Sequence, residues 1–277
     1  MPPTGIAAGV LSAISFGAGD FAGAFAARRA GALIVVAGAH FVGLLALLVG
    51  LLILAPPIPD LGPALIGVAA GVAGAGGLAA LYRGMSLGSM GMVTSLSGAG
   101  SLAIPLVAGA AFGASVTPLQ LAGVACVAAA GTAASGASRD EVGRQALLLA
   151  AAAAIGFGTW YVLLDLAARG GDPLWALVFS RATSASLATA FALGRFDRSR
   201  FPFRIVIAAG LFDVGGNALY VVAREVIPIG LAAALTGLYP VVTMILARVV
   251  LGERLPRLGQ LGVAFALLGI VLISAAG

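Results

Sequence analysis

Residues 32–54 read ALIVVAGAHFVGLLALLVGLLIL, an apolar run that contains a single histidine, His40. A helix that crosses a bilayer needs about 20 consecutive apolar residues, and this run satisfies that requirement. Similar runs follow one another along the chain and predict ten spans, near residues 5–27, 32–54, 63–83, 88–112, 117–136, 145–168, 173–194, 203–224, 228–251 and 257–275. The runs lack the alternation of apolar and polar residues that outer-membrane β-barrels show. The sequence therefore predicts an all-α membrane protein with ten transmembrane helices.

The composition of the 277-residue chain agrees with this prediction. Hydrophobic residues make up 61% of the chain and charged residues only 9%, whereas a soluble domain carries about 25% charged residues. The net charge of +5 comes from scattered arginines, whereas nucleic-acid-binding proteins gather basic residues on one face. We therefore expect no nucleic acid as a partner. Because the chain has one cysteine and one histidine, we also expect no disulfide, no metal site and no cofactor.

The two halves of the chain resemble each other. Residues 90–96 (MGMVTSL) align with residues 229–235 (IGLAAAL), and residues 80–82 (ALY) align with residues 218–220 (ALY). Each half contains five predicted spans, and a duplicated unit with an odd number of spans must cross the bilayer in opposite senses. The sequence therefore predicts two inverted five-helix repeats.

The predicted repeats cover residues 1–137 and 144–277, with a cytoplasmic linker at residues 138–143. Eleven arginines lie in alternate connections that would share one face: Arg28, Arg29, Arg83, Arg139, Arg144, Arg195, Arg198, Arg200, Arg204, Arg254 and Arg257. Only Arg169 and Arg224 lie in connections on the other face. Cytoplasmic connections carry an excess of arginine and lysine. We therefore expect a multi-pass protein of the inner (plasma) membrane with both termini periplasmic or extracellular.

The C-terminal part of the chain carries a recognisable set of motifs. Residues 237–242 read GLYPVV, residues 251–255 read LGERL, and glycine-rich segments follow at residues 259–262 (GQLG) and 269–270 (GI). This combination resembles the closing stretch of a repeat of the EamA family, within the drug/metabolite transporter superfamily. The resemblance implies a ten-helix, two-repeat secondary transporter that moves small organic solutes through a central cavity.

Two polar residues lie at matching depths in the first two predicted spans. Asp20 is about seven residues and His40 about nine residues from the predicted cytoplasmic ends, which corresponds to roughly 10 and 13 Å. Antiparallel neighbours could bring Asp20 and His40 together. Three roles are open for them: a hydrogen bond that packs the helices, proton coupling, or contact with the substrate alone. Proton coupling is an option because histidine titrates near neutral pH and burial shifts the titration of a carboxyl group.

A second polar group falls near the middle of the seventh and eighth predicted spans. Arg181 occupies the position in the second repeat that His40 occupies in the first, and Asp213 lies in the next span. Asp213, Asn217 and Tyr220 are spaced i, i+4, i+7 and share one helical face. We expect this face to line a cavity, because lipid cannot solvate it. Either Arg181 and Asp213 form an ion pair that orients the helices, or a free Arg181 holds a substrate carboxylate.

Further residues have more modest predicted roles. Trp160 and Tyr239 are candidates for the wall of the substrate cavity, with helix packing as the alternative. We expect Pro105 and Pro240 to bend the fourth and ninth spans, because proline removes a backbone donor. Glu253, in a predicted cytoplasmic connection, is expected to tie helix ends together rather than contact substrate.

The favoured function is export of amino-acid-like or other small metabolites by alternating access, with proton coupling left open. Multidrug or lipophilic-cation efflux is the second hypothesis. A third reading is an enzyme: residues 17–20 (GAGD) match the GxGD string of intramembrane aspartyl proteases, with Asp213 as the second carboxylate. Asp20 precedes Asp213, however, whereas those proteases place the GxGD aspartate second, so we expect no enzyme. The expected partners are a small-molecule substrate and the lipid bilayer, with protons and a second copy in a homodimer left open.

Overall fold

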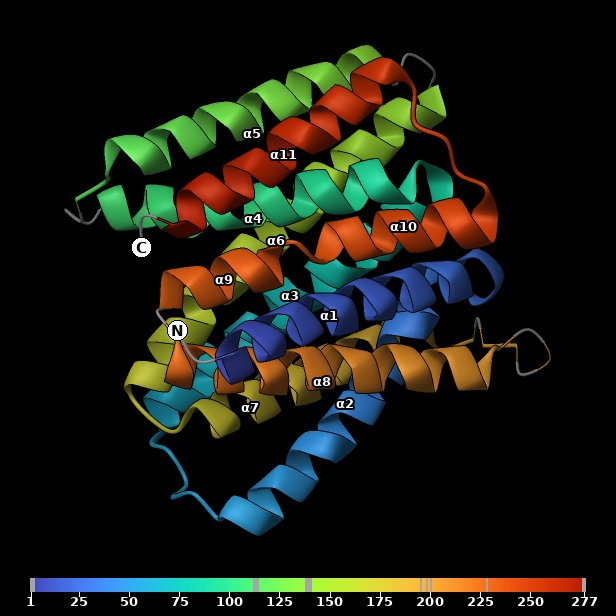
Figure 1. Ribbon diagram of the computed structural model, residues 1–277. Coiled ribbons are helices and arrows are strands. Elements are labelled where there is room, and N and C mark those ends of the chain that lie inside the picture. The colour runs from blue at the N-terminus through green and yellow to red at the C-terminus, as the bar shows by residue number, and fades with distance from the viewer. Residues whose placement is uncertain are drawn as a thin grey trace.

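The computed structural model describes residues 3–111, 115–137, 141–194, 196, 197, 199, 201–227 and 229–275, and within them it contains helices and no strand. The helices are α1 (Pro3–Ala30), α2 (Ala32–Leu54), α3 (Leu61–Leu87), α4 (Met90–Ala111), α5 (Pro118–Ala137), α6 (Glu141–Arg169), α7 (Pro173–Ala192), α8 (Phe203–Val226), α9 (Ile229–Gly237), α10 (Tyr239–Leu251) and α11 (Arg257–Ala275). They form one bundle (Figure 1). Residues 138–140 of the predicted linker lie outside the described residues, as do Arg195, Arg198 and Arg200.

Eight segments of the described chain are long and apolar enough to cross a membrane: Pro3–Ala30, Ala32–Leu54, Leu61–Leu87, Met90–Val107, Gly143–Arg169, Phe203–Val226, Leu231–Leu251 and Arg257–Ser274. A shorter apolar segment, Pro118–Ala134, lies in α5. The protein is therefore an all-helical, multi-pass membrane protein. Its sixth predicted span begins earlier than expected, because α6 starts at Glu141, inside the predicted linker.

The ninth predicted span, residues 228–251, consists of two helices rather than one bent helix. At the junction, Leu238 adopts φ −79° and ψ 4°, and Pro240 stands in the first turn of α10. The missing N–H of proline cannot continue the bonding of α9, but it costs nothing at a helix start. The amide of Leu238 donates to Leu235 O at 3.2 Å instead. Pro105, by contrast, lies inside α4, which continues past it.

The main helix contacts join the first half of the chain to the second. Helix α1 packs against α8, α3 against α6, α2 against α7 and α5 against α11. In Figure 1, α5 and α11 lie side by side at one edge of the bundle, and α1 lies along α8. In membranes, small residues at helix interfaces allow the helix backbones to approach closely. On α3, glycines Gly67, Gly71, Gly74 and Gly77 face neighbouring helices, whereas a Cβ on Gly76 would meet nothing within 4 Å.

Two glycine contacts, one made by α8 and one by α3, set the positions of α2 and α7. A Cβ on Gly210 of α8 would lie 2.5 Å from the carbonyl oxygen of Ala39, and Gly71 of α3 stands in the same way against the carbonyl of Ser180. Ala39 and Ser180 directly precede His40 and Arg181. Both interior polar residues are therefore placed by a backbone contact that only glycine permits.

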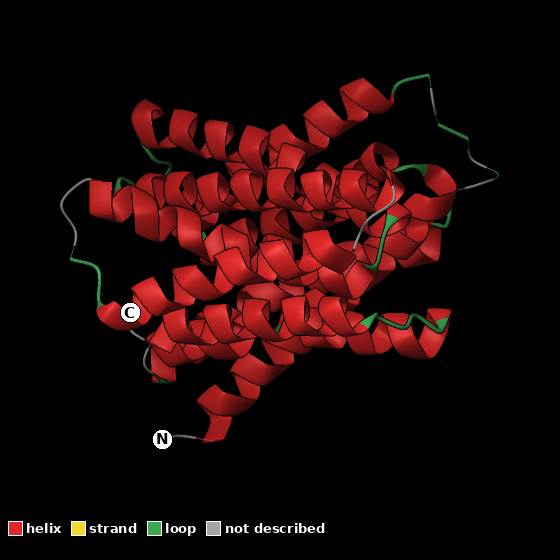
Figure 2. Cartoon of the chain, turned by 90° about the horizontal axis from the view of Figure 1, so that it is seen from above, coloured by secondary structure: helices red, strands yellow, loops and turns green. Residues whose placement is uncertain are grey.

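Both chain ends lie at the same end of the bundle. Helix α1 begins and α11 ends at the left in Figure 1, and Figure 2 shows the same arrangement from above. The connections α2–α3 and α6–α7 meet each other, since a Cβ on Gly171 would lie 2.8 Å from Pro59 Cβ, and Trp175 Nε1 of α7 donates to Pro56 O at 3.2 Å. These connections also line a hollow of about 450 Å³ between residues 57–60 and 170–173.

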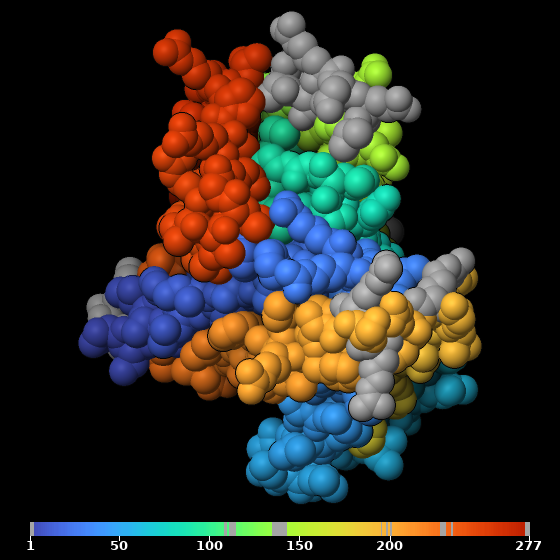
Figure 3. Space-filling model, turned by 90° about the vertical axis from the view of Figure 1, so that its right-hand side faces the viewer, coloured from blue at the N-terminus to red at the C-terminus, as the bar shows by residue number. Residues whose placement is uncertain are grey.

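The C-terminal part of α2 projects from the bundle. Figure 3 shows this segment standing out from the rest of the surface. Its last turn is strongly exposed, with Leu52 83% and Ile53 75% accessible. In a membrane protein such side chains contact lipid, so the projection agrees with a helix surrounded by bilayer.

Candidate functional site

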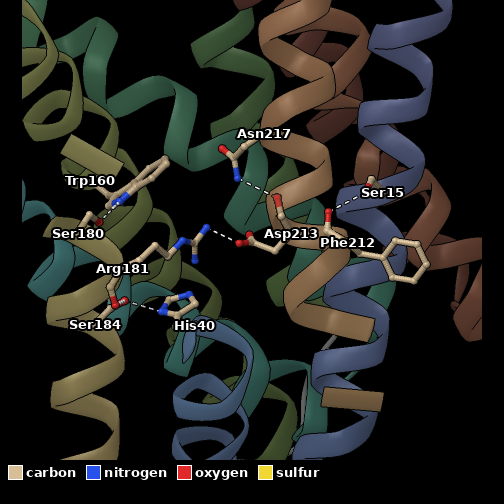
Figure 4. A network of polar contacts seen from close by, with 9 residues as sticks. All are labelled: Ser15, His40, Trp160, Ser180, Arg181, Ser184, Phe212, Asp213 and Asn217. Carbon is tan, nitrogen blue, oxygen red and sulfur yellow. Dashed lines mark hydrogen bonds and ion pairs between the residues drawn. The ribbon is translucent and has the colours of Figure 1, made fainter. Parts of the chain in front are cut away.

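Helix α7 carries the polar face around which the interior cluster is built. The helix begins cleanly, because Asp172 accepts a hydrogen bond from Leu174 N at 2.8 Å and Pro173 occupies the first turn. Farther along, Ser180, Arg181 and Ser184 are all buried. Figure 4 shows the Ser180 and Ser184 side chains on either side of Arg181.

Arg181 forms an ion pair with Asp213 of α8. The Arg181 side chain is 9% exposed and that of Asp213 is 28% exposed. Figure 4 shows the guanidinium group extending from α7 toward the carboxylate on α8. A buried charge is costly unless it is paired, so each partner compensates the other. Of the two predicted arrangements, this structure therefore contains the paired one.

His40 is 4% exposed and reaches α7 rather than α1. Its Nδ1 lies 2.5 Å from Ser184 Oγ, and that hydroxyl also lies 3.3 Å from the carbonyl oxygen of Arg181 (Figure 4). No hydrogen bond joins His40 to Asp20 within the described chain. The structure therefore shows the His40 imidazole bonded to Ser184 of the other half of the chain, and not to Asp20 as the sequence allowed.

Trp160 of α6 is the second residue that α7 holds. Its Nε1 donates to Ser180 Oγ at 2.9 Å (Figure 4), and its ring meets that of Tyr161 edge to face at a centroid distance of 5.0 Å. A tryptophan with its N–H satisfied presents the rest of its ring as an apolar surface. Trp160 therefore lies beside the ionic cluster, because its partner Ser180 directly precedes Arg181 in α7.

Asp20 of α1 lies where three helices approach α1 through glycine. A Cβ on Gly19 would lie 3.4 Å from Asp213 N of α8, one on Gly17 would lie 2.6 Å from Tyr239 O of α10, and Gly23 stands against the Tyr82 ring of α3. Asp20 itself is only partly exposed. No hydrogen bond or ion pair of Asp20 is found in the part of the chain that the structure describes. Asp20 therefore contrasts with Asp213, whose charge Arg181 compensates.

Tyrosine hydroxyl groups lie near Asp20. Three of them lie within electrostatic range of its carboxylate, those of Tyr82, Tyr161 and Tyr239. The Tyr239 hydroxyl also lies over Gly98, and its ring meets Phe16 edge to face at 6.4 Å. Sequence reasoning proposed Tyr239 but missed Tyr82. The internal repeat contained the missing signal, because Tyr82 aligns with Tyr220.

The predicted polar face of α8 is only partly used for contacts between helices. Asn217 Nδ2 donates to Asp213 O of its own helix at 2.8 Å (Figure 4). Tyr220, one turn farther, packs against an apolar cluster that includes Ala8 and Ile227. The structure therefore brings Asp213 and Asn217 together and places Tyr220 at the edge of this group.

Backbone carbonyls of α8 are held by serines of α1. Ser15 Oγ donates to Phe212 O at 2.6 Å (Figure 4), and Ser12 Oγ donates to Gly216 O at 2.8 Å. Hydroxyl groups that bond a helix backbone in this way fix one helix against another in a medium without water. The two bonds bracket Asp213 and hold it against α1. Sequence reasoning did not single out these serines.

Glu253 lies in the connection between α10 and α11 and ties two helices together. Its carboxylate accepts hydrogen bonds from Met90 N at 3.0 Å, from Gly91 N at 3.3 Å and from Ser89 Oγ. These donors form the first turn of α4, where a negative charge is stabilising. Glu253 thus joins the α10–α11 connection to α4, which confirms its predicted role in joining helix ends.

Asp20 and Asp213, the two carboxylates of the aspartyl-protease hypothesis, do not form an acid pair in the described structure. Asp213 is engaged by Arg181, and no hydrogen bond links it to Asp20. A carboxylate dyad needs the two groups close enough to share a proton. The hollow between residues 57–60 and 170–173 also lies at the end of the bundle, away from both aspartates.

Comparison with known proteins agrees with the architecture and the motifs. No curated protein has a significantly matching sequence. A solved structure titled "Crystal structure of protein" superposes with a TM-score of 0.61 at 17% identity, covering 96% of this chain and 96% of that chain. At this identity the likeness concerns the fold, and it extends over both halves. The family model for the EamA-like transporter family matches residues 144–275. This match supports an assignment to that family, whose members are membrane transporters.

Proposed function

We propose that this protein is a secondary transporter that exports amino-acid-like or other small metabolites across the cytoplasmic membrane by alternating access. The observation that carries the proposal is the ionic cluster inside an apolar bundle, at the junction of α1 and α2 with α7 and α8. Charged groups within spans are costly and mark solute pathways. The residues we propose for the pathway are Asp20, His40, Arg181, Asp213, Asn217, Tyr220, Trp160 and Tyr239.

The proposed architecture is ten spans in two inverted repeats, with α9 and α10 together forming the ninth span. The packing of α1 on α8 and of α3 on α6 supports it, because these are equivalent pairs if the halves are related by a twofold axis. The contacts of Gly71 with Ser180 and of Gly210 with Ala39 are equivalent in the same way. Both chain ends at one end of the bundle agree with an even number of spans. We propose that this end lies outside the cytoplasm, because the arginine distribution in the sequence favours that orientation.

The cluster suits a solute that carries both signs of charge. Arg181 offers a guanidinium group that can hold a carboxylate through two parallel hydrogen bonds once Asp213 releases it. Asp20 offers a carboxylate that has no other partner in the described chain. An α-amino acid presents the complementary pair of groups, which is why amino-acid-like metabolites are our first choice.

An untargeted comparison of culture media tests this proposal. We expect medium from cells that overproduce the protein to accumulate one or a few zwitterionic metabolites, compared with medium from a deletion strain. The same metabolites should leave proteoliposomes that contain the purified protein. Unchanged media, together with inactive proteoliposomes, would contradict the proposal.

A second candidate function is efflux of lipophilic cations. The tyrosine hydroxyls around Asp20 and the nearby Trp160 favour it, because aromatic faces attract cations and apolar bodies. Resistance assays separate the two candidates. Overproduction that protects cells against amino-acid analogues supports the first, and protection against lipophilic cations supports the second.

A further inference from the structure

The charged side chains in the interior of the described bundle do not add up to zero. Arg181 contributes one positive charge and Asp213 one negative charge, and these two are paired. Asp20 contributes a second negative charge, and no cation faces it in the described chain. The interior cluster therefore carries one uncompensated negative charge when both aspartates are ionised.

The other titratable groups that face Asp20 leave this sum unchanged. Tyrosine keeps its proton at neutral pH, which covers Tyr82 of α3, Tyr161 of α6 and Tyr239 of α10, and Arg181 of α7 keeps its proton in the pair with Asp213. His40 of α2 lies beside Arg181 and bonds Ser184, and no carboxylate in the described chain pairs with it to stabilise a second positive charge. His40 therefore counts as neutral, and one positive charge is needed to balance the cluster.

An uncompensated charge is costly at this position. Asp20 is only partly exposed where α3, α8 and α10 approach α1 at Gly23, Gly19 and Gly17, and the carboxylates of Asp20 and Asp213 repel each other. Burying a charge without a partner is strongly unfavourable, so a stable state of the site requires a counter-charge. In the empty site that counter-charge is a proton on the cluster.

From this charge balance we infer that, in each stable state, the solute and the bound protons together supply one positive charge, and that Asp20 is the group that receives it. The inference rests on the proposed transport function and deepens it. A monocation displaces the proton from Asp20 on binding. A zwitterion binds together with that proton, its carboxylate taking Arg181 while Asp213 becomes the protonated group. An anion binds only with one additional proton. The number of protons exchanged is thus set by the charge of the solute.

Three probes with the same ring and different charges test the inference. They are 2-phenylethylamine (a cation), phenylalanine (a zwitterion) and 3-phenylpropionate (an anion). Titration calorimetry of the purified protein at neutral pH, in two buffers of different ionisation enthalpy, gives the protons released or taken up on binding. We expect release of about one proton with the amine, no net change with phenylalanine and uptake of about one with the acid.

Variants assign the charge to Asp20. In Asp20→Asn we expect proton release by 2-phenylethylamine to disappear and its affinity to fall at least about tenfold. Asp20→Glu keeps the carboxylate and should keep the release, which separates loss of charge from loss of fold. Asp165→Asn is the matched control, because Asp165 pairs with Arg169 at 2.7 Å on an exposed surface, with 58% of its side chain accessible.

Three results would overturn the inference. The first is a proton count that is the same for all three probes, and the second is release that persists in Asp20→Asn. The third is wild-type protein that does not bind 2-phenylethylamine, because an unpartnered carboxylate among tyrosines must attract it. None of these results decides the proposed transport function, which is judged separately by metabolite efflux from cells and proteoliposomes.

Discussion

Binding of a solute inside this bundle depends on single side chains, and Arg181 is the first of them. Changing Arg181 to Ala removes the guanidinium group that pairs with Asp213. We expect binding of 3-phenylpropionate to weaken at least about tenfold more than binding of the neutral 3-phenylpropionamide. Arg169→Ala, which breaks the exposed pair with Asp165, is the control and should leave both affinities unchanged. Equal losses for the two ligands would assign Arg181 to helix orientation alone.

Glu253 carries a prediction about stability rather than solute binding. Glu253→Gln keeps the size of the side chain but removes the charge at the start of α4 and one carboxylate acceptor of the Met90 and Gly91 amides. Loss of a helix cap typically costs about 1 kcal/mol. We expect a lower thermal unfolding temperature in detergent than for Glu225→Gln, whose position is exposed. Equal unfolding temperatures of the two variants would show that the tie to α4 contributes nothing.

Residue types could be predicted from the sequence at this scale, but their partners could not. Isolated charges in apolar runs mark Asp20, Arg181 and Asp213 as interior groups. Whether Arg181 meets Asp213 depends on the distance between α7 and α8, which the chain sets through contacts remote in sequence. The same holds for His40, whose partner Ser184 lies in the other half of the chain.

At the scale of helices, glycine positions control how closely α2 and α7 approach the cluster. In Gly210→Ala, the new Cβ would lie 2.5 Å from Ala39 O and 2.9 Å from Val42 Cβ, so α2 must move away from α8. We expect a loss of stability of about 1–3 kcal/mol, as for other overpacked interiors. The measurement is thermal unfolding of the purified variant.

Gly76→Ala provides the matched control for this helix contact. A Cβ at Gly76 meets nothing within 4 Å, and alanine is the better helix former. This variant should therefore be as stable as the wild type or slightly more stable. If both glycine variants unfold at the same temperature, close backbone approach does not determine the packing of α2.

Helix positions were predictable because apolar runs and their Pro and Gly boundaries are local properties. The division of the ninth span into α9 and α10 was not, since Pro105 and Pro240 both stand inside apolar runs. Helix α4 continues past Pro105, whereas the chain breaks before Pro240. Thr243 Oγ1 of α10 donates to Gly17 O of α1 at 3.1 Å, a contact between residues remote in sequence that apolar runs do not reveal.

At the scale of the whole molecule, the prediction concerns the two chain ends. Both lie at the same end of the bundle, so tags on the N-terminus and the C-terminus should face the same side of the membrane. The arginine distribution indicates the outer side. Protease digestion of the tags in intact spheroplasts is the measurement. Removal of only one tag would require an odd number of crossings and would contradict the ten-span proposal.

The shared location of the two ends has one more consequence. A short connector could join the end of α11 to the start of α1 without crossing the bundle. The chain could then be opened between α5 and α6, at residues 137 and 141, to give a circular permutant that begins with the second half. Permutation is generally tolerated where termini are close together. Because the loop arginines keep their places on the bundle, such a permutant would retain its orientation while its new ends emerge on the opposite side of the membrane.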